Sequence, residues 1–367
     1  MKPTIVRQLS IRGLRNLQAV DLEPAETVNV VYGDNGQGKT SLLEAIYLVA
    51  TTRSFRTHRV KELIAHGVEA CHMSTRLDDG VSARTQTIAM SAGQQIVRVD
   101  GQKPESLAAY AIRTPVVVFH PGELGLTMGT AAVRRTLMDR VALFQKPSSL
   151  AANRAYTRAM RERQKALETE GVRSRSVDAW EQLLAEHGAA VTTARRIACE
   201  QIDGHAQDSF RHMAPPGLRM TLRYAPGGSE DVDTCRQRLF EDRDKDARRP
   251  SARFGPHRDD LAIQLGGRSA RVEASQGQHR LMTLSLKVAE LACLSEAAGS
   301  RAVLLLDDVS SELDASRATA FFSLLGTRLD QVFLTTARRE IAVGVEQSLG
   351  ATTLFEVVAG QVRRPVR

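Results

Sequence analysis

The chain has 367 residues and a formal net charge of +8, with a sequence pI near 9.6. Hydrophobic residues make up 42% of it, which is ample for a folded core, but no run approaches the roughly 18 apolar residues of a membrane span. The composition therefore argues against a membrane protein. Because aromatic residues make up only 4%, it also argues against a stacking platform for single-stranded nucleic acid. The positive charge favours an anionic partner.

The first motif is a glycine-rich phosphate-binding loop of the pattern G-x-x-x-x-G-K-[ST]. It consists of Gly33, Asp34, Asn35, Gly36, Gln37, Gly38, Lys39 and Thr40. The β-branched run at 28–32 before it predicts a buried strand, and residues 39–48 after it predict a helix. Strand, loop and helix thus fall in the order that a phosphate site requires.

The residue types in this loop suit the binding of a triphosphate. Glycines allow backbone conformations in which N–H groups point inward and surround a phosphate at a helix N-terminus. We expect Lys39 to reach the β and γ oxygens and the Thr40 hydroxyl to bind Mg²⁺. The loop therefore predicts ATP together with Mg²⁺.

A second group of residues, near the other end of the chain, predicts the rest of the same site. The apolar run 302–306 is typical of a strand buried on both faces of a parallel sheet, and it ends in Asp307 and Asp308. We expect Asp307 to hold Mg²⁺ and Asp308 to orient or deprotonate the attacking water. One more buried strand is expected to end at Thr335 and Thr336, either of which could face the γ-phosphate.

A third motif opens a strongly helical stretch and consists of Ser275, Gln276, Gly277 and Gln278. Ser275 is a natural N-cap, and Gly277 lets a backbone or a phosphate approach closely. One interpretation is an ordinary capped helix. The other is that the helix N-terminus points at the γ-phosphate of ATP bound to a second subunit, so that ATP drives dimerisation. Asp314, just beyond the paired aspartates, is expected to belong to the same nucleotide site.

The middle of the chain changes in character. Residues 70–99 alternate enough to predict antiparallel strands, whereas 131–210 predict two long helical segments, broken near 171–174 and each up to roughly 35 residues long. The charge-dense stretch 241–246 is expected to be an exposed helix or linker. The helical region is also basic, since residues 134–170 contain nine lysines and arginines against four acids. Such a run is a candidate track for DNA phosphates or, for any single residue, an ordinary solvated helix face.

Together these segments closely resemble the RecF family of bacterial recombination mediators. The likeness runs through nearly the whole chain, and its most specific parts are Arg-Ser-Phe-Arg at 53–56 and Gly-Pro-His-Arg-Asp-Asp-Leu at 255–261. It also includes residues 9–17, 33–40, 275–278 and 305–314.

This resemblance implies an α/β fold: an ABC-type ATPase head with mixed β-sheets and flanking helices, formed by residues 1–120 and 251–367, and a helical arm inserted at 121–250. It implies an ATP-dependent homodimer on duplex, gapped or single–double-strand junction DNA, with slow DNA-stimulated hydrolysis. The implied partners are RecR directly, and RecO and RecA indirectly, in loading RecA at single-strand gaps. Arg15 and Asn16 match an N-terminal element that lies near the nucleotide in this superfamily.

Some features depart from the wider ABC pattern. Gln276 stands where many relatives have Gly, Asp308 is one methylene shorter than the usual Glu, and no histidine follows the last strand. These departures suit the RecF family and argue for slow hydrolysis. The four cysteines are far apart, without metal-ligand spacing, and no signal peptide is apparent, so we expect reduced thiols in a cytoplasmic protein.

Several alternatives stay open. A transporter-coupled ATPase would share the loop and the 275–278 motif, although the long basic insertion argues against it. A structural adaptor with a vestigial ATP site is disfavoured because Lys39 and both aspartates are intact. Residues 53–56 could touch nucleotide or DNA, or merely tie a loop to the head. His257 is expected to be a hydrogen-bonded structural histidine rather than a metal ligand.

Overall fold

The computed structural model describes residues 2–249, 251–308, 331–340, 342–343 and 352–365. The chain forms two compact units, Met1–Glu123 with Glu290–Arg367 and, between them, Leu124–Ala289. The division into a head at 1–120 and 251–367 and an arm at 121–250 stays a prediction. Asp314 lies outside the described residues.

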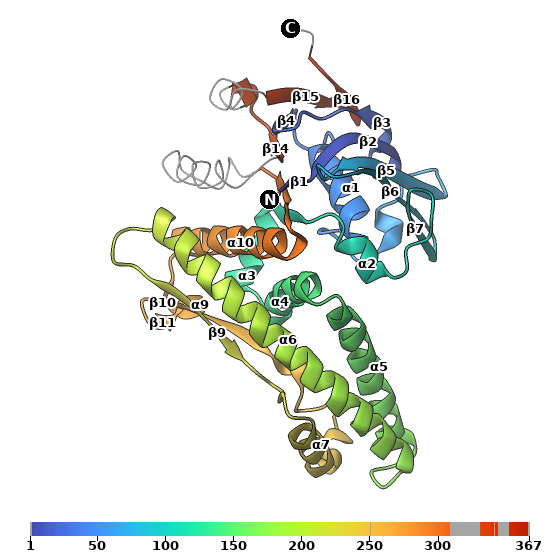
Figure 1. Cartoon of the computed structure of the whole chain (residues 1–367), viewed down its shortest axis with the longest axis vertical. Helices are drawn as coiled ribbons and strands as arrows, with labels where there is room; N and C mark the ends of the chain where they lie inside the picture. The colour runs from blue at the N-terminus through green and yellow to red at the C-terminus, as the bar shows by residue number, and fades with distance from the viewer. Residues whose placement is uncertain (1, 250, 309–330, 341, 344–351, 366–367) are drawn as a thin grey trace. The chain divides into compact units, whose positions relative to one another are not determined.

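The first unit contains two large sheets (Figure 1). A six-stranded sheet has the order β16-β15-β4-β14-β13-β8, formed by Gln361–Arg363, Thr352–Val358, Val28–Tyr32, Val332–Thr336, Val303–Leu306 and Val116–Phe119. A five-stranded antiparallel sheet has the order β3-β2-β5-β6-β7, formed by Leu17–Leu22, Ile5–Leu14, Ala70–Asp78, Ala83–Ser91 and Gln94–Val99. The smaller elements are β1 (Lys2–Pro3), β12 (Ser300–Arg301), α2 (Leu107–Ala111), η1 (Val60–Glu62) and η2 (Pro121–Leu124).

The six-stranded sheet is parallel except for its β15–β16 edge pair, and this arrangement positions the predicted site. Strands β13 and β14, and β8 at the edge, are buried along their whole length, as expected for parallel strands covered on both faces. Helix α1 (Lys39–Thr51) follows β4 and shares one apolar core with both large sheets. The predicted strands at 28–32 and 302–306, the helix after the loop and the antiparallel strands within 70–99 are therefore confirmed.

Helices and one small sheet make up the second unit. The helices are α3 (Gly125–Met128), α4 (Ala131–Gln145), α5 (Ser148–Thr169), α6 (Arg175–Met213), α7 (Val232–Glu241), α8 (Arg243–Asp246), α9 (Ala270–Glu273) and η3 (Pro256–Arg258), and α10 (Gln276–Ala298) continues from this unit into the first. The sheet has the order β11-β10-β9, formed by Arg268–Ser269, Asp260–Leu265 and Met220–Ala225. Among the helices of the described residues, none combines the length and apolar character needed to cross a bilayer.

The predicted pair of long helices is in fact three helices. The break near 171–174 is present, between α5 and α6, but the first segment is divided again between α4 and α5. The division falls at Pro147, and Lys146 before it adopts an extended conformation, with φ −142° and ψ 94°. A residue that precedes proline is pushed out of the helical region by the proline ring, which explains why α4 ends there.

The charge-dense stretch 241–246 is helical, as predicted, but only half of it is exposed: Glu241, Asp244 and Lys245 are exposed, whereas Asp242, Arg243 and Asp246 are buried. Arg243 and Asp246 are buried, because their charges belong to a network of ion pairs inside the second unit. Glu181 accepts from both Arg163 and Arg243, and Asp246 accepts from Arg163 at 2.9 Å. Buried charges of opposite sign that satisfy one another can lie in a core, whereas a lone charge could not.

Candidate functional site

The phosphate-binding loop connects the buried end of β4 to the first turn of α1. Gly36 and Gly38 have φ of 81° and 121°, a region that favours glycine, so the loop needs them to turn back on itself. A cavity of about 300 Å³ opens beside it. Its lining comes from both ends of the first unit and consists of Arg15, Asn16, Asn35, Gly36, Gly38, Lys39, Thr40, Ser41, Arg56, Asp307, Asp308 and Thr335.

Lys39 lies under this loop. Its Nζ donates to the carbonyl oxygens of Gly33 at 2.6 Å and Asp34 at 2.8 Å. Burial lowers the pKa of Lys39, and the nearby carboxylates of Asp308 and Asp307 partly oppose that shift. The ammonium group is thus held by neutral carbonyls, so its charge is available to an anion.

Thr40 and Asp307 join the two halves of the predicted site. The Thr40 hydroxyl lies 2.9 and 3.0 Å from the two carboxylate oxygens of Asp307, although the residues are 267 positions apart. Asp307 directly follows β13, and its N–H donates to the Phe119 carbonyl on β8 at 2.8 Å. The parallel sheet therefore brings the carboxylate to the start of α1, as the sequence predicted.

Thr335 orders the two aspartates. Its hydroxyl donates to Asp307 at 2.8 Å and accepts from the Asp308 N–H at 2.9 Å. Thr336, by contrast, accepts from the Arg338 N–H. Of the two threonines offered by the sequence, Thr335 borders the cavity, and it acts by positioning Asp307 and Asp308.

Asp308 has φ of +52°, a left-handed conformation that few residues other than glycine, asparagine and aspartate adopt readily. It borders the cavity beside Asp307. The chain turns sharply here, directly after β13, so that consecutive carboxylates both reach the same hollow.

The residues present fit ATP with Mg²⁺. The loop forms a cradle at a helix N-terminus, with Lys39 as its cation, and Thr40 with Asp307 provides a hydroxyl and a carboxylate oxygen for a hard cation. The described residues hold no cluster of three or more His, Cys, Asp or Glu suited to a metal. Mg²⁺ is usually bound by one or two protein ligands together with substrate phosphates, and Thr40 with Asp307 could supply those ligands.

Arg15 and Asn16 border the cavity and also hold its walls. The Arg15 guanidinium pairs with Glu44, a fully buried carboxylate on α1. Asn16 donates to the Gly36 carbonyl at 3.2 Å and accepts from the Ser41 hydroxyl at 3.1 Å. Asn16 thus connects the middle of the phosphate loop to the first turn of α1.

The turn between β15 and β16 contacts the same loop. Ala359 and Gly360 donate their N–H groups to Gln37, to its side-chain oxygen at 2.5 Å and its carbonyl at 3.0 Å. A Cβ at Gly360, where φ is 77°, would overlap the carbonyl oxygen of Asn16. No local sequence pattern indicates this contact, because the hairpin and the loop are more than 300 residues apart in the chain.

Residues 53–56 tie the loop after α1 to that helix. Ser54 donates to Glu44, and Arg56 lies 3.5 Å from the same carboxylate. Phe55 packs edge-on against Tyr47 with ring centroids 5.5 Å apart. Residues 53–56 therefore connect this loop to α1, and Arg56 also lines the cavity. Glu44 is an acid between apolar residues of α1, and the sequence does not indicate its role.

The segment 255–261 is a structural hub of the second unit. Asp259 is fully buried and accepts from Arg195 at 3.0 Å, from the Tyr224 hydroxyl at 2.6 Å and from the Gly227 N–H at 2.8 Å. His257 lies 2.6 Å from the Tyr156 hydroxyl and 2.8 Å from the Ala252 carbonyl, as expected of a hydrogen-bonded structural histidine. Burial lowers the pKa of His257.

The N-cap predicted at Ser275 is confirmed. The Ser275 hydroxyl accepts from the Gln278 N–H at 3.3 Å, and the Gln278 side chain accepts from the Ser275 N–H at 2.8 Å. This reciprocal pair is a capping box, which satisfies N–H groups that a helix start otherwise leaves open. Gln276 and Gly277 form the first turn of α10.

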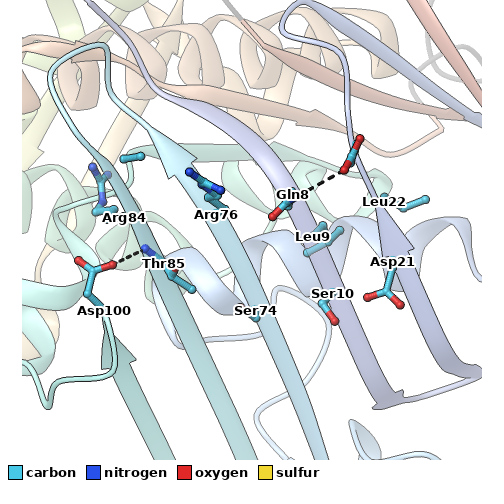
Figure 2. A pocket seen from close by; sticks show the side chains of 12 residues that line it. Gln8, Leu9, Ser10, Asp21, Leu22, Ser74, Arg76, Arg84, Thr85 and Asp100 are labelled. Atoms are coloured by element: carbon cyan, nitrogen blue, oxygen red, sulfur yellow. Dashed lines mark hydrogen bonds between the residues drawn. The ribbon is translucent and has the colours of Figure 1, made fainter.

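A larger hollow, of about 660 Å³, lies on the outer face of the five-stranded sheet (Figure 2). Figure 2 shows Arg76 and Arg84 on one side and Asp21 on the other, with Gln8 donating to Glu23 at 3.3 Å. Its lining mixes both charges and contains none of the phosphate-loop residues. The smaller cavity therefore remains the candidate nucleotide site.

Comparison with known proteins supports this description. The family model "RecF/RecN/SMC N terminal domain" matches residues 5–357. A "DNA replication and repair protein RecF" from Anaeromyxobacter sp. (strain Fw109-5) is 35% identical over 98% of both chains, and one from Myxococcus xanthus (strain DK1622) is 33% identical over 96% of both. The solved "recombination mediator protein RecF-ATPrS in RecFOR pathway" has a TM-score of 0.88 at 26% identity, covering 100% of this chain and 99% of that one. An Smc head domain from Pyrococcus furiosus, at 13% identity, has a TM-score of 0.55, covers 98% of this chain and 95% of that one, and shows the fold alone.

The mixed sheet with its phosphate loop, the adjoining antiparallel sheet and the helical insertion define an ATPase head of the ABC and SMC class, as the sequence predicted. Within that class, members of one family resemble this chain over nearly its full length. This chain belongs to the RecF family.

Proposed function

We propose that the chain is an ATP-dependent DNA clamp of recombinational repair. Its family relatives carry the name DNA replication and repair protein, and a solved relative bears the description of a recombination mediator in the RecFOR pathway. The observation that carries the proposal is the contact of Thr40 with Asp307, which brings the phosphate loop and the paired aspartates from the two ends of the chain to one cavity. A vestigial site would have no reason to keep this pair, Lys39 and Asp308 together.

In this proposal the loop N–H groups and Lys39 hold the triphosphate, and Thr40 with Asp307 holds Mg²⁺. When bound, Mg²⁺ neutralises charge that develops on the phosphoryl oxygens. Asp308 accepts a hydrogen bond from the attacking water and orients it. Thr335 keeps both carboxylates in place.

The clamp itself would form from two copies. Ser275, Gln276, Gly277 and Gln278 would supply the N-terminus of α10 to the γ-phosphate held by the partner copy. Asp314, outside the described residues, is proposed to contribute at the same interface. DNA with gapped or junction structure would lie across the dimer, RecR would bind it, and RecO and RecA would act downstream. Hydrolysis would release the clamp.

The test is ATP hydrolysis by the full chain with and without a gapped duplex. We expect slow turnover that gapped DNA stimulates severalfold, because DNA favours the dimer in which the site is complete. Hydrolysis that is indifferent to DNA would contradict the proposal. Intact duplex and single strands of equal length serve as matched controls for the DNA structure.

A further inference from the structure

We infer that four cations on the outward side of α5 form a surface for the phosphate backbone of duplex DNA. They are Arg154, Arg158, Arg161 and Lys165, at intervals of four, three and four residues. That spacing places all four on one side of a helix. All four residues are exposed. The inference rests on the proposed function, since it names the contact surface of a DNA-binding protein.

The opposite side of α5 faces its neighbour. Tyr156, Ala159, Arg163 and Ala166 are buried there, and α5 packs along α6 within the second unit (Figure 1). At 100° per residue the four cations point away from this packed side. They are therefore free of any role in the core of the unit.

The structure separates these four from other basic residues nearby. Arg134 pairs with both oxygens of Asp260, at 2.7 and 2.9 Å, and Arg163 pairs with Glu181 and Asp246. Among the described residues, the four cations of α5 make no side-chain hydrogen bond and no ion pair. The basic run at 134–170 therefore contains two kinds of cation: those held in ion pairs within the unit, and those available to bind an anion.

The four cations place like charges at neighbouring positions along one side of α5. Like charges at i,i+3 and i,i+4 destabilise a helix, whereas alternating acids and bases would stabilise it. The stripe keeps three such like-charged pairs in succession. A polyanion laid along it would relieve the repulsion.

The shape of the stripe favours duplex DNA. Eleven residues of helix rise about 16 Å, so the cations form a straight line of that length. Duplex DNA carries one negative charge per about 1.7 Å of its axis, which allows several contacts along such a line. α5 has one aromatic residue, the buried Tyr156, so it offers phosphate contacts without base stacking.

The experiment measures binding of a fluorescent 30-base-pair duplex to the full chain, in ATP and Mg²⁺, over a range of salt concentrations. The test variant replaces all four cations with glutamine. The matched control replaces four exposed cations of the same unit that are already ion-paired, Arg211, Arg238, Lys245 and Arg268. Both variants lower the net charge by four. A third variant, with the three arginines of the stripe changed to lysine, keeps the charge.

We expect the stripe variant to reduce the slope of log affinity against log salt by about 3.6, since each phosphate contact contributes about 0.9. The control and the lysine variant should keep the wild-type slope. Equal losses in the stripe variant and the control would overturn the inference, as would a stripe variant that keeps the wild-type slope for the duplex. A wild-type chain that binds no duplex would instead refute the proposed function. The melting temperature of each variant checks that it folds.

Discussion

At the scale of single residues, the site depends on pairs of side chains that hold one another. Thr335 forms hydrogen bonds with both Asp307 and Asp308. Asn16 donates to a carbonyl of the phosphate loop, and Glu44 accepts from Arg15 and Ser54. The sequence predicts which residues would contact nucleotide, and several of them, among them Lys39, Thr40 and Asp307, line one cavity. Sequence reasoning could not identify Thr335 or Glu44 as their supports, because those roles exist only once the strands and α1 have packed.

Asp308→Asn tests the proposed role of the second carboxylate. Asparagine tolerates the left-handed conformation at this position, so the backbone should be unchanged. We expect ATP affinity within about threefold of wild type. Single-turnover hydrolysis should fall by about 10²-fold or more, the usual contribution of a positioned general base. Rapid turnover by this variant would assign the role to another group.

At the scale of elements, the strands and the loop that could be predicted from the sequence belong mostly to the parallel sheet. The apolar run 302–306, the β-branched run 28–32 and the glycines of the loop have local signatures, and the structure places them as expected. The break at Pro147 also has a local signature, although it was passed over. The burial of Arg243 and Asp246 has no local signature, since it depends on partners up to 83 residues away. The same holds for the β15–β16 turn on the phosphate loop.

Gly360→Ala tests whether that turn positions the loop. The new Cβ would overlap the Asn16 carbonyl, which should displace Asn16 and Gln37 and weaken ATP binding about tenfold, or about 1.4 kcal/mol. Gly93→Ala is the matched control: its φ is also positive, at 102°, but no atom lies within 4 Å of the added Cβ. Both variants should lose about 1–2 kcal/mol of stability from backbone strain.

Calorimetric titration with a slowly hydrolysed ATP analogue separates these effects. Only Gly360→Ala should lose affinity. If it binds nucleotide as tightly as Gly93→Ala does, the hairpin supports the fold of the first unit without shaping its site.

At the scale of the whole molecule, the account joins remote parts of one chain into a site that a second copy is proposed to complete. The position of Ser275 at a capped helix N-terminus, in a unit other than that of the phosphate loop, suits a residue offered to a partner. Nothing local to either motif specifies assembly, so only the behaviour of the full chain can test it.

The most direct measurement is the mass of the chain in solution, by gel filtration with light scattering, in ATP and in ADP. We predict twice the monomer mass of 40.2 kDa in ATP with Mg²⁺, and the monomer in ADP. Lys39→Met, which lacks the cation of the phosphate loop, should stay monomeric in both. A monomer in saturating ATP, or a Lys39→Met dimer that forms as readily as wild type, would contradict the account.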